Sequence, residues 1–517
     1  MRYLTILTIA FTTLFGKGLP ETVLADQTRL PETPFADQIR LPETPFADQI
    51  RLPETVLADQ TRLPETVLAD QIRLPETVLA DQIRLPETVL ADRIRLPETV
   101  LADQIRVNAA LATPVMLADK KQTAYLQVGL TGFHLKKENI APINVALVID
   151  KSGSMQGDKI RRAKKAANMA VNLLHKHDII SVISFDHRIE VLLPATKPTD
   201  KRTIHAAINR LRAGGSTALF SGVKKGAQEV RKFLEKDRVN RIILLSDGKA
   251  NVGPDSPQEL GNLGASLGKE GIAVTTLGLG LGYNEDLMAQ LAEKSDGNHT
   301  LIENATDLAR FFKSEFKNLF SVVATNVKVT ITCAKGIRPV RVLGREADIQ
   351  GQQIQITLNQ LYSKHQKNLL LEIEVPSTKA GQKLTLAKVK TVYRNMVTNT
   401  TDSLTNQVTA TFTTSAQLVI EKTNAAVMVT VLEQLALEKN ELAIKLRDRG
   451  ELKKARQVLL DNAARLKKQA KKYKSEALEK LSDLNRNDAQ NLRREDWRRQ
   501  RKIMRGNIHK RRNYQTY

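Results

Sequence analysis

The 517-residue sequence contains one cysteine, one tryptophan and only 4% aromatic residues. The single cysteine, Cys333, excludes an intrachain disulfide and a cysteine-based metal site. It lies in an alternating apolar and polar segment, which favours a small buried strand residue over a reactive thiol. After residue 15 no apolar run reaches the ~20 residues that a membrane-spanning helix needs. The sequence therefore gives no support to a transmembrane channel.

The amino-terminal segment combines a short apolar stretch with small residues. The stretch Tyr3–Phe15 is too short to span a membrane but has the length of a signal-peptide hydrophobic region. Val23, Leu24 and Ala25 resemble a cleavage site. We therefore predict a signal peptide over residues 1–25 and an extracytoplasmic location, either periplasmic, cell-surface or secreted. The alternative is a frayed amino terminus on a cytoplasmic protein.

Eight copies of an eleven-residue unit with the consensus LPETVLADQIR occupy residues 19–106. The proline in every copy interrupts a continuous helix. Seven of the eight copies carry one net negative charge. The remaining copy, at residues 85–95, is neutral because it has Arg93. The repeats therefore contribute about −7 to a chain whose net charge is +23. We interpret the repeats as a low-complexity spacer, with a stacked solenoid as the alternative. The strongly basic remainder favours anionic partners, namely nucleic acid, anionic lipid or acidic protein.

From residue 107 onward the pattern is that of folded domains. Residues 107–143 are predicted to supply strands, including Thr123–Gly132, that join a later β-sandwich. Across residues 144–320 apolar strands alternate with amphipathic helices, which predicts an α/β fold with a Rossmann-like, doubly wound, mostly parallel sheet. The predicted helices are Lys159–His175, Lys201–Leu211, Leu219–Leu234, Gln258–Lys269, Asn284–Lys294 and Ala305–Phe320.

Oxygen-bearing side chains occur in three loops that follow apolar strands or precede helices in this region. The first loop contains Asp150, Ser152 and Ser154, the second contains Thr217 after two glycines, and the third contains Asp247. In open parallel sheets ligands bind beyond the carboxyl ends of the strands. Hard cations such as Mg²⁺ prefer oxygen ligands. One such loop alone could be an ordinary helix cap, but the three together predict a metal site.

The same five residues resemble the metal-ion-dependent adhesion site of von Willebrand factor type A domains. The likeness includes the phrases VALVIDKSGSM, GGSTALFSGV and ILLSDGKANVG, and it covers roughly Val145 to Phe320. The phrase LGLGLGYNEDL is similar to a bacterial branch called Ca-activated chloride channel homologues, which includes relatives of the inter-α-trypsin inhibitor heavy chain. The resemblance implies that the hydroxyls of Ser152, Ser154 and Thr217, with Asp150 and Asp247, hold Mg²⁺, with Mn²⁺ or Ca²⁺ as alternatives.

The resemblance also implies a function. A partner's Glu or Asp would replace a water on the ion, so we expect a metal-dependent protein-binding module for adhesion or scaffolding. We expect no enzyme, because no residue is nominated as a general base beside the ion. The glycines from Gly278 to Gly282 lack the full dinucleotide-binding spacing. The alternative is an intracellular assembly factor or scaffold that works with a partner ATPase.

The carboxyl-terminal third changes character twice. Residues 321–415 alternate in the manner of a β-sandwich. Residues 416–484 have helical spacing broken at Arg449-Gly450, which predicts a helical hairpin. Residues 485–517 hold eleven Lys and Arg against three Asp and Glu. This basic tail could bind nucleic acid or anionic lipid, and its default interpretation is a solvated helical face with a frayed end.

Overall fold

The computed structural model describes residues 104–136, 139–247, 250–492 and 497–512, together with short strands between Leu24 and Arg95. The predicted signal peptide lies almost entirely outside the described residues. The chain divides into two compact units, Met1–Gln104 and Ile105–Tyr517.

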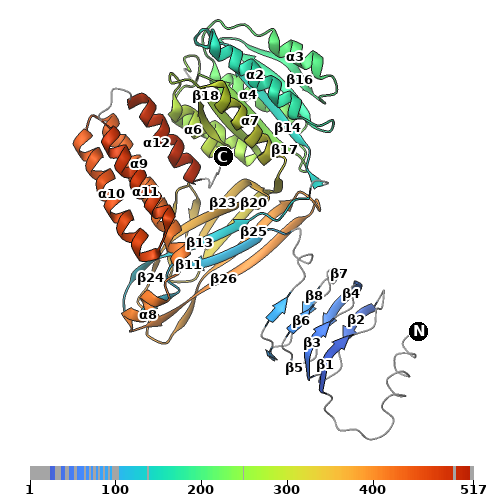
Figure 1. Ribbon diagram of the computed structural model, residues 1–517, viewed down its shortest axis with the longest axis vertical. Helices are drawn as coiled ribbons and strands as arrows, with labels where there is room; N and C mark the ends of the chain where they lie inside the picture. Colours follow the sequence, from blue (N-terminus) through green and yellow to red (C-terminus); the bar gives the residue numbers. More distant parts are fainter. Residues whose placement is uncertain are drawn as a thin grey trace. The chain divides into compact units, whose positions relative to one another are not determined.

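The first unit is built from the eleven-residue repeats, whose strands pair in parallel (Figure 1). The register joins residues 22 positions apart, as when Leu24 pairs with Phe46 and Gln49 with Gln71. Each copy therefore stacks on the second copy after it, so odd and even copies form separate sheets. These paired strands are of the kind that the stacked-solenoid alternative describes, and the interpretation of the repeats as a spacer stays a prediction. The strands are β1 (Leu24–Arg29), β2 (Ala36–Arg40), β3 (Phe46–Arg51), β4 (Thr55–Arg62), β5 (Thr66–Leu68), β6 (Gln71–Arg73), β7 (Thr77–Leu79), β8 (Gln82–Arg84), β9 (Thr88–Leu90) and β10 (Arg93–Arg95).

The second unit contains an α/β domain whose sheet has the order β16-β15-β14-β17-β18-β19. Only the edge strand β16 runs antiparallel to its neighbour, which confirms the predicted mostly parallel sheet. Every residue of β14, β15, β17 and β18 is buried, as expected for parallel strands that are covered on both faces. The sequence analysis missed β16 and β19. The strands are β14 (Ile143–Asp150), β15 (Ile179–Phe185), β16 (Ile189–Thr196), β17 (Val239–Ser246), β18 (Ile272–Leu279) and β19 (His299–Ile302).

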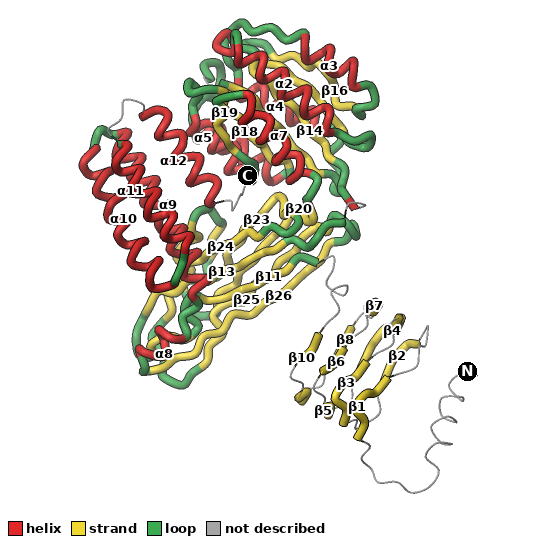
Figure 2. The backbone as a smooth tube through the Cα atoms, viewed as in Figure 1, coloured by secondary structure: helices red, strands yellow, loops and turns green. Residues whose placement is uncertain are grey.

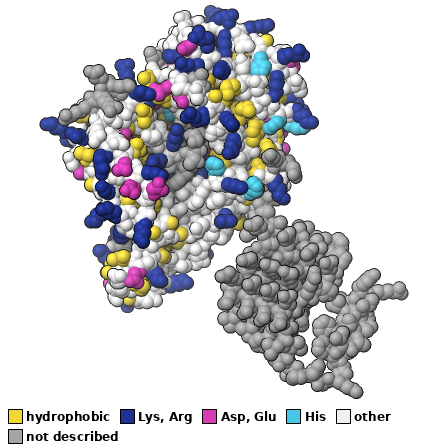
Figure 3. All heavy atoms as spheres, viewed as in Figure 1, with side chains coloured by type: hydrophobic (Ala, Val, Ile, Leu, Met, Phe, Trp, Pro, Cys, Tyr) yellow, Lys and Arg dark blue, Asp and Glu magenta, His cyan; other side chains and the backbone are white. Residues whose placement is uncertain are grey.

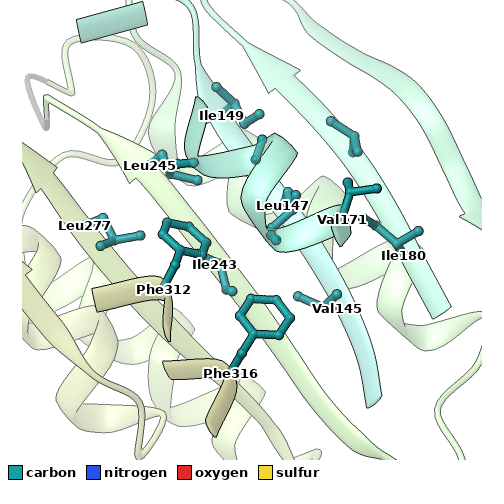
Figure 4. Close-up of a cluster of buried hydrophobic side chains, with 14 of the residues drawn as sticks. Val145, Leu147, Ile149, Val171, Ile180, Ile243, Leu245, Leu277, Phe312 and Phe316 are labelled. Atoms are coloured by element: carbon teal, nitrogen blue, oxygen red, sulfur yellow. The ribbon is translucent and has the colours of Figure 1, made fainter. Parts of the chain in front are cut away.

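Helices cover both faces of this sheet because successive side chains of a strand point to opposite sides. Leu147 of β14 faces Phe312 and Phe316 in the core beneath the first helix layer (Figure 4). Val148 faces the second layer, where a Cβ on Gly226 would lie 2.5 Å from its Cγ2. Glycine at that position therefore lets the helix lie close to the sheet. The first layer is α2 (Asp158–Leu173), α3 (Lys201–Asn209) and α7 (Ala305–Leu319), and the second is α4 (Leu219–Arg231), α5 (Pro257–Lys269) and α6 (Glu285–Lys294).

A β-sandwich carries the α/β domain as an insertion. Its two sheets have the orders β11-β13-β24-β21 and β12-β26-β25-β20-β23-β22, with one aliphatic core between them. The predicted strand at Thr123–Gly132 does join this sandwich, because β13 pairs with β24 over ten residues. The strands are β11 (Arg106–Leu111), β12 (Val115–Leu117), β13 (Gln122–Thr131), β20 (Val322–Cys333), β21 (Arg338–Leu343), β22 (Asp348–Gln350), β23 (Gln353–Tyr362), β24 (Gln366–Val375), β25 (Lys383–Asn395) and β26 (Thr401–Thr413).

The helical region is larger than the predicted hairpin over residues 416–484 (Figure 2). The break at Gly450 is confirmed by its φ of +83°. A second break was missed at Lys474, whose φ of 49° ends one helix before Ser475 caps the next. The helices are α8 (Ala416–Glu421), α9 (Ala425–Asp448), α10 (Leu452–Tyr473), α11 (Glu476–Asn491) and α12 (Trp497–Arg512). None of the helices in the described residues is both long and apolar enough to cross a membrane.

The described part of the basic segment includes α12, residues 497–512, which is a packed helix and not a solvated face. Met504 and Ile508 of α12 lie in the core of the helical region. Lys502 is 5% exposed, donates to the Tyr283 carbonyl at 2.7 Å and pairs with Glu285. Further ion pairs join Arg499 to Glu303, Arg501 to Glu285, Asp286 and Asp448, Arg505 to Asp286, and Arg512 to Glu441. The anionic partner of these side chains is the protein's own surface. Other Lys and Arg side chains are spread over the visible face of this unit (Figure 3).

A buried polar network joins the α/β domain to the sandwich. Arg241 of β17 is fully buried and donates to Thr275 at 3.1 Å, Gln360 at 2.5 Å and Tyr362 at 2.9 Å. Gln360 and Tyr362 belong to β23 of the sandwich. The guanidinium also lies 3.7 Å from the Glu315 carboxylate of α7, which is fully buried as well. One cation therefore links two parts of the fold through its fixed fork of donors.

Asp488 gives the helical region a pH-dependent stability. Its carboxyl group, on α11, is 4% exposed and accepts a hydrogen bond from Gln500 of α12 at 2.8 Å. Burial raises its pKa to about 7. The folded state then holds this proton more tightly than the unfolded state, so the stabilisation is full below the ordinary pKa of 3.8 and is lost as pH rises to about 7.

We expect Asp488→Asn to remove that pH dependence. At pH 8 the variant should be more stable than the wild type by up to about 4 kcal/mol, because no charge is buried. Thermal unfolding between about pH 5 and 8 measures the effect. Asp483→Asn, at an exposed position of the same helix, is the control. Parallel pH profiles for Asp488→Asn and the wild type would contradict the prediction.

Candidate functional site

The predicted site lies at the carboxyl edge of the central strands. β14 ends at Asp150 and the adjacent parallel strand β17 ends just before Asp247, so both carboxylates emerge at the same edge. The loop after β14 is bonded to the loop that carries Thr217. Gly153 N–H donates to the Gly215 carbonyl at 2.9 Å, and Gly214 N–H donates to the carbonyl of Lys151 at 2.7 Å.

Gly215 also allows its loop to lie close to the loop that follows β15. Its φ is +82°, and a Cβ there would lie 2.5 Å from Nδ1 of His187. Glycine is therefore required at position 215, whereas a Cβ on Gly214 would meet nothing within 4 Å. The structure thus brings together the three loops that the sequence analysis selected.

Asp150 is fully buried at the end of β14. Its Oδ1 accepts the Ser152 N–H at 2.8 Å, and its Oδ2 accepts the Ser246 hydroxyl at 2.6 Å. Burial raises the pKa of Asp150 to about 6, although the hydrogen bonds from Ser152 and Ser246 act in the opposite direction. Both oxygens are therefore held in fixed positions by donors from the chain.

Asp247 is also fully buried, and its two oxygens have different partners. Oδ1 accepts the Ser154 hydroxyl at 2.8 Å, and Oδ2 accepts Nζ of Lys159 at 2.6 Å. The hydroxyls of Ser152 and Ser154 lie 3.2 Å apart. The first and third loops are thus joined by direct side-chain contacts.

Thr217 is 2% exposed and is held by the segment that follows β17. Its N–H donates to Oδ1 of Asn251 at 2.7 Å. Its carbonyl accepts the N–H groups of Asn251 and Val252 at 3.2 and 3.3 Å. The second and third loops are therefore joined as well, and all five predicted residues belong to one cluster of loops.

Sequence reasoning missed two residues of the cluster, Lys159 and Asn251. Lys159 lies in the first turn of α2, where the positive end of the helix dipole disfavours a cation. That unfavourable position was a usable signal, because it indicates an acidic partner nearby. Asn251 follows Asp247 within the phrase ILLSDGKANVG and gave no separate signal.

The chemistry of the cluster suits a hard divalent cation. The side-chain donors are three hydroxyl and four carboxylate oxygens, and each carboxylate oxygen accepts one hydrogen bond from the chain. A carboxylate oxygen has further acceptor capacity, so these bonds orient the groups without exhausting them. No group of three or more His, Cys, Asp or Glu in the described residues is placed to hold a metal ion, and this cluster contains two such residues, Asp150 and Asp247.

Comparison with known proteins points to the same region. The model of the von Willebrand factor type A domain family matches residues 144–314. The uncharacterized protein sll0103 of Synechocystis sp. is 31% identical over 286 residues, which cover 53% of this chain and 67% of that protein. The uncharacterized protein YfbK of Escherichia coli is 30% identical over 213 residues, which cover 41% of this chain and 37% of YfbK.

More distant likenesses extend the comparison. The inter-α-trypsin inhibitor heavy chain H3 of Pongo abelii is 27% identical over 200 residues, or 37% of this chain and 23% of that protein. The branch predicted from the sequence is thus represented among the relatives. The structure of a von Willebrand factor type A protein from Catenulispora acidiphila aligns with a TM-score of 0.60 at 16% identity. It covers 73% of this chain and 88% of that one, which shows a shared fold.

Proposed function

Because this chain belongs to the family of proteins with a von Willebrand factor type A (VWA) domain, we propose that it is a metal-dependent protein-binding module for adhesion or scaffolding. A VWA domain supports a role in protein interaction. The observation that carries the metal-dependent proposal is the cluster of three hydroxyls and two buried carboxylates at the carboxyl edge of β14 and β17.

The five residues would bind the ion in two different ways. Ser152, Ser154 and Thr217 would hold the ion through hydroxyl oxygens, while Asp150 and Asp247 would supply negative charge, some of it through water. We propose Mg²⁺, with Mn²⁺ or Ca²⁺ as alternatives. When bound, the ion supplies an electrophilic position at which a Glu or Asp of the partner protein replaces a water.

We also propose that the protein is not an enzyme. Support comes from the roles of Asp150 and Asp247, whose carboxylates would hold the ion, and from the sequence, which nominates no other residue as a general base beside it. Incubation of the purified protein with phosphate-ester and peptide substrates is expected to give no turnover.

The location that fits this function is extracytoplasmic. The apolar stretch Tyr3–Phe15 supports it, although that stretch lies outside the described residues. Fractionation of the source cells tests the proposal. Full-length protein with Met1 retained in the cytoplasm would favour the alternative of an intracellular scaffold that works with an ATPase.

The function is tested by metal-dependent capture with the full-length chain. Immobilised wild-type protein is expected to retain at least one extracytoplasmic protein in Mg²⁺ and to release it in EDTA. Ser154→Ala and Asp150→Asn should weaken Mn²⁺ binding, measured by isothermal titration calorimetry, by about tenfold or more, because each loses a ligand or its charge. Both variants should also lose capture.

Ser266→Ala, on the exposed face of α5, is the matched control and should behave as the wild type. Circular dichroism spectra confirm that each variant is folded. Capture that is equally strong in EDTA and in both site variants would disprove the proposed metal dependence.

A further inference from the structure

The ammonium group of Lys159 occupies an unusual position in the proposed metal site. It lies 2.6 Å from Oδ2 of the fully buried Asp247 and 3.1 Å from the Ser154 carbonyl oxygen. Its Cε lies 3.6 Å from where a Cβ on Gly280 would be, so the β18–α6 loop borders the aliphatic part of the side chain. Lys159 is therefore a fixed positive charge inside the cluster of donors.

We infer that Lys159 makes divalent-ion binding at this site depend on an acidic ligand, by neutralising one of the two carboxylates. The inference rests on the proposed function. It adds that the partner group that contacts the ion must carry a negative charge. Lys159 would act as a specificity-determining residue that needs no contact with the partner.

The charges of the cluster carry this inference. Asp150 and Asp247 contribute two negative charges and Lys159 contributes one positive charge. The adjacent Lys151 pairs with Asp186 at 3.5 Å and with Glu190 at 3.4 Å, and these three groups carry one net negative charge. The Glu190 side chain is 58% exposed, so solvent screens that charge from the cluster. A bound divalent ion therefore leaves one positive charge uncompensated. One carboxylate from a partner protein compensates it, whereas a neutral ligand does not.

The position of Lys159 also explains why the ion alone should bind weakly. The cation and the ammonium would share Asp247 at close range in a largely buried site, where charge repulsion is stronger than in water. An acidic ligand relieves this repulsion. Ion and acidic ligand should consequently strengthen each other's binding by the same factor, as linkage requires.

The test compares Mn²⁺ binding to full-length variants by isothermal titration calorimetry in chloride. Lys159→Met should bind Mn²⁺ about tenfold to a hundredfold more tightly than the wild type, because the repelling charge is gone. Lys159→Arg keeps the charge and should stay close to the wild type. Lys165→Met, at an exposed position of the same helix, is the matched control and should not differ from the wild type.

A second arm replaces chloride with acetate at constant ionic strength, so that acetate serves as the carboxylate probe. Acetate should tighten Mn²⁺ binding to the wild type more than to Lys159→Met. Lys159→Gln provides a second neutral variant if the methionine variant is misfolded by circular dichroism. Equal or weaker Mn²⁺ binding by the neutral variants, with binding by the wild type intact, would overturn this inference and leave the proposed function standing. Absence of Mn²⁺ binding by the wild type and all variants would instead overturn the proposed function.

Discussion

Replacing Arg241 with methionine is expected to lower the free energy of unfolding by about 3–5 kcal/mol. The guanidinium is fully buried, and its removal leaves the Glu315 carboxylate without its cation. It also removes the hydrogen bonds to Gln360 and Tyr362, through which the VWA domain is joined to β23 of the sandwich. A buried charge without its partner is one of the few point changes that destabilise a protein this strongly.

The measurement is the shift of the urea unfolding midpoint, followed by circular dichroism. Arg231→Met is the matched control, because Arg231 pairs with Glu270 at the surface. Its effect should stay below about 1 kcal/mol. The double variant Arg241→Met with Glu315→Gln should regain a large part of the loss, because Thr275 and Asn298 still bond the side chain at position 315. Equal effects of the Arg241 and Arg231 variants would show that the buried network does not stabilise the domain.

Replacing Glu285 with glutamine is expected to loosen α12 from the VWA domain at a cost of about 3 kcal/mol. Glu285 is 6% exposed and pairs with both Lys502 and Arg501. Arg501 keeps Asp286 and Asp448. The ammonium of Lys502 keeps the Tyr283 carbonyl and the face of the Tyr283 ring, 4.2 Å away, but it has no other carboxylate among the described residues. The loss therefore falls on a buried lysine.

The sole tryptophan of the chain reports this change. Trp497, at the start of α12, donates to Asp448 at 3.0 Å and lies under the Arg447 guanidinium. We expect a red shift of its fluorescence and faster amide exchange along α12 in Glu285→Gln. Glu476→Gln, at the exposed pair with Lys480, should change neither. Unchanged exchange in α12 would mean that Glu285 does not hold the helix in place.

The sequence predicted the α/β domain well because its signals are local. A buried strand is a short run of apolar residues, and a covering helix repeats its apolar residues every three or four positions. The six predicted helices of this domain are all present, with ends that differ by a few residues. The edge strand β16 escaped notice because its residues are mostly half-buried or exposed, so its pattern is weak.

The helical region was predicted less well, because the contacts that hold it are not local in the sequence. Eleven Lys and Arg residues from Arg486 to Arg512 indicated a solvated face, because the sequence does not show which acidic groups lie opposite them. Glu285 and Asp286 are more than 200 residues away, and only packing brings them to α12. The split between α10 and α11 was missed for a different reason. Lys474 adopts the left-handed conformation that glycine usually marks.

The repeats show most clearly what the sequence determined and what only the tertiary structure decided. The sequence determined the eleven-residue unit, but identical copies contain nothing that specifies which copy pairs with which. Only the three-dimensional arrangement decided that partners lie 22 residues apart, because two copies are needed to return the chain to the same sheet.

For the proposed site, the sequence by itself identified the five oxygen-bearing residues and the edge of the sheet at which they lie. This was possible because adjacent parallel strands deliver their carboxyl ends to one edge. Only the tertiary structure decided that each carboxylate oxygen accepts a donor and that Lys159 is the partner of Asp247. Those contacts depend on how α2 packs against the loop after β17. The position of Lys159 in the sequence indicates an acidic partner nearby, but it does not show which carboxylate that partner is.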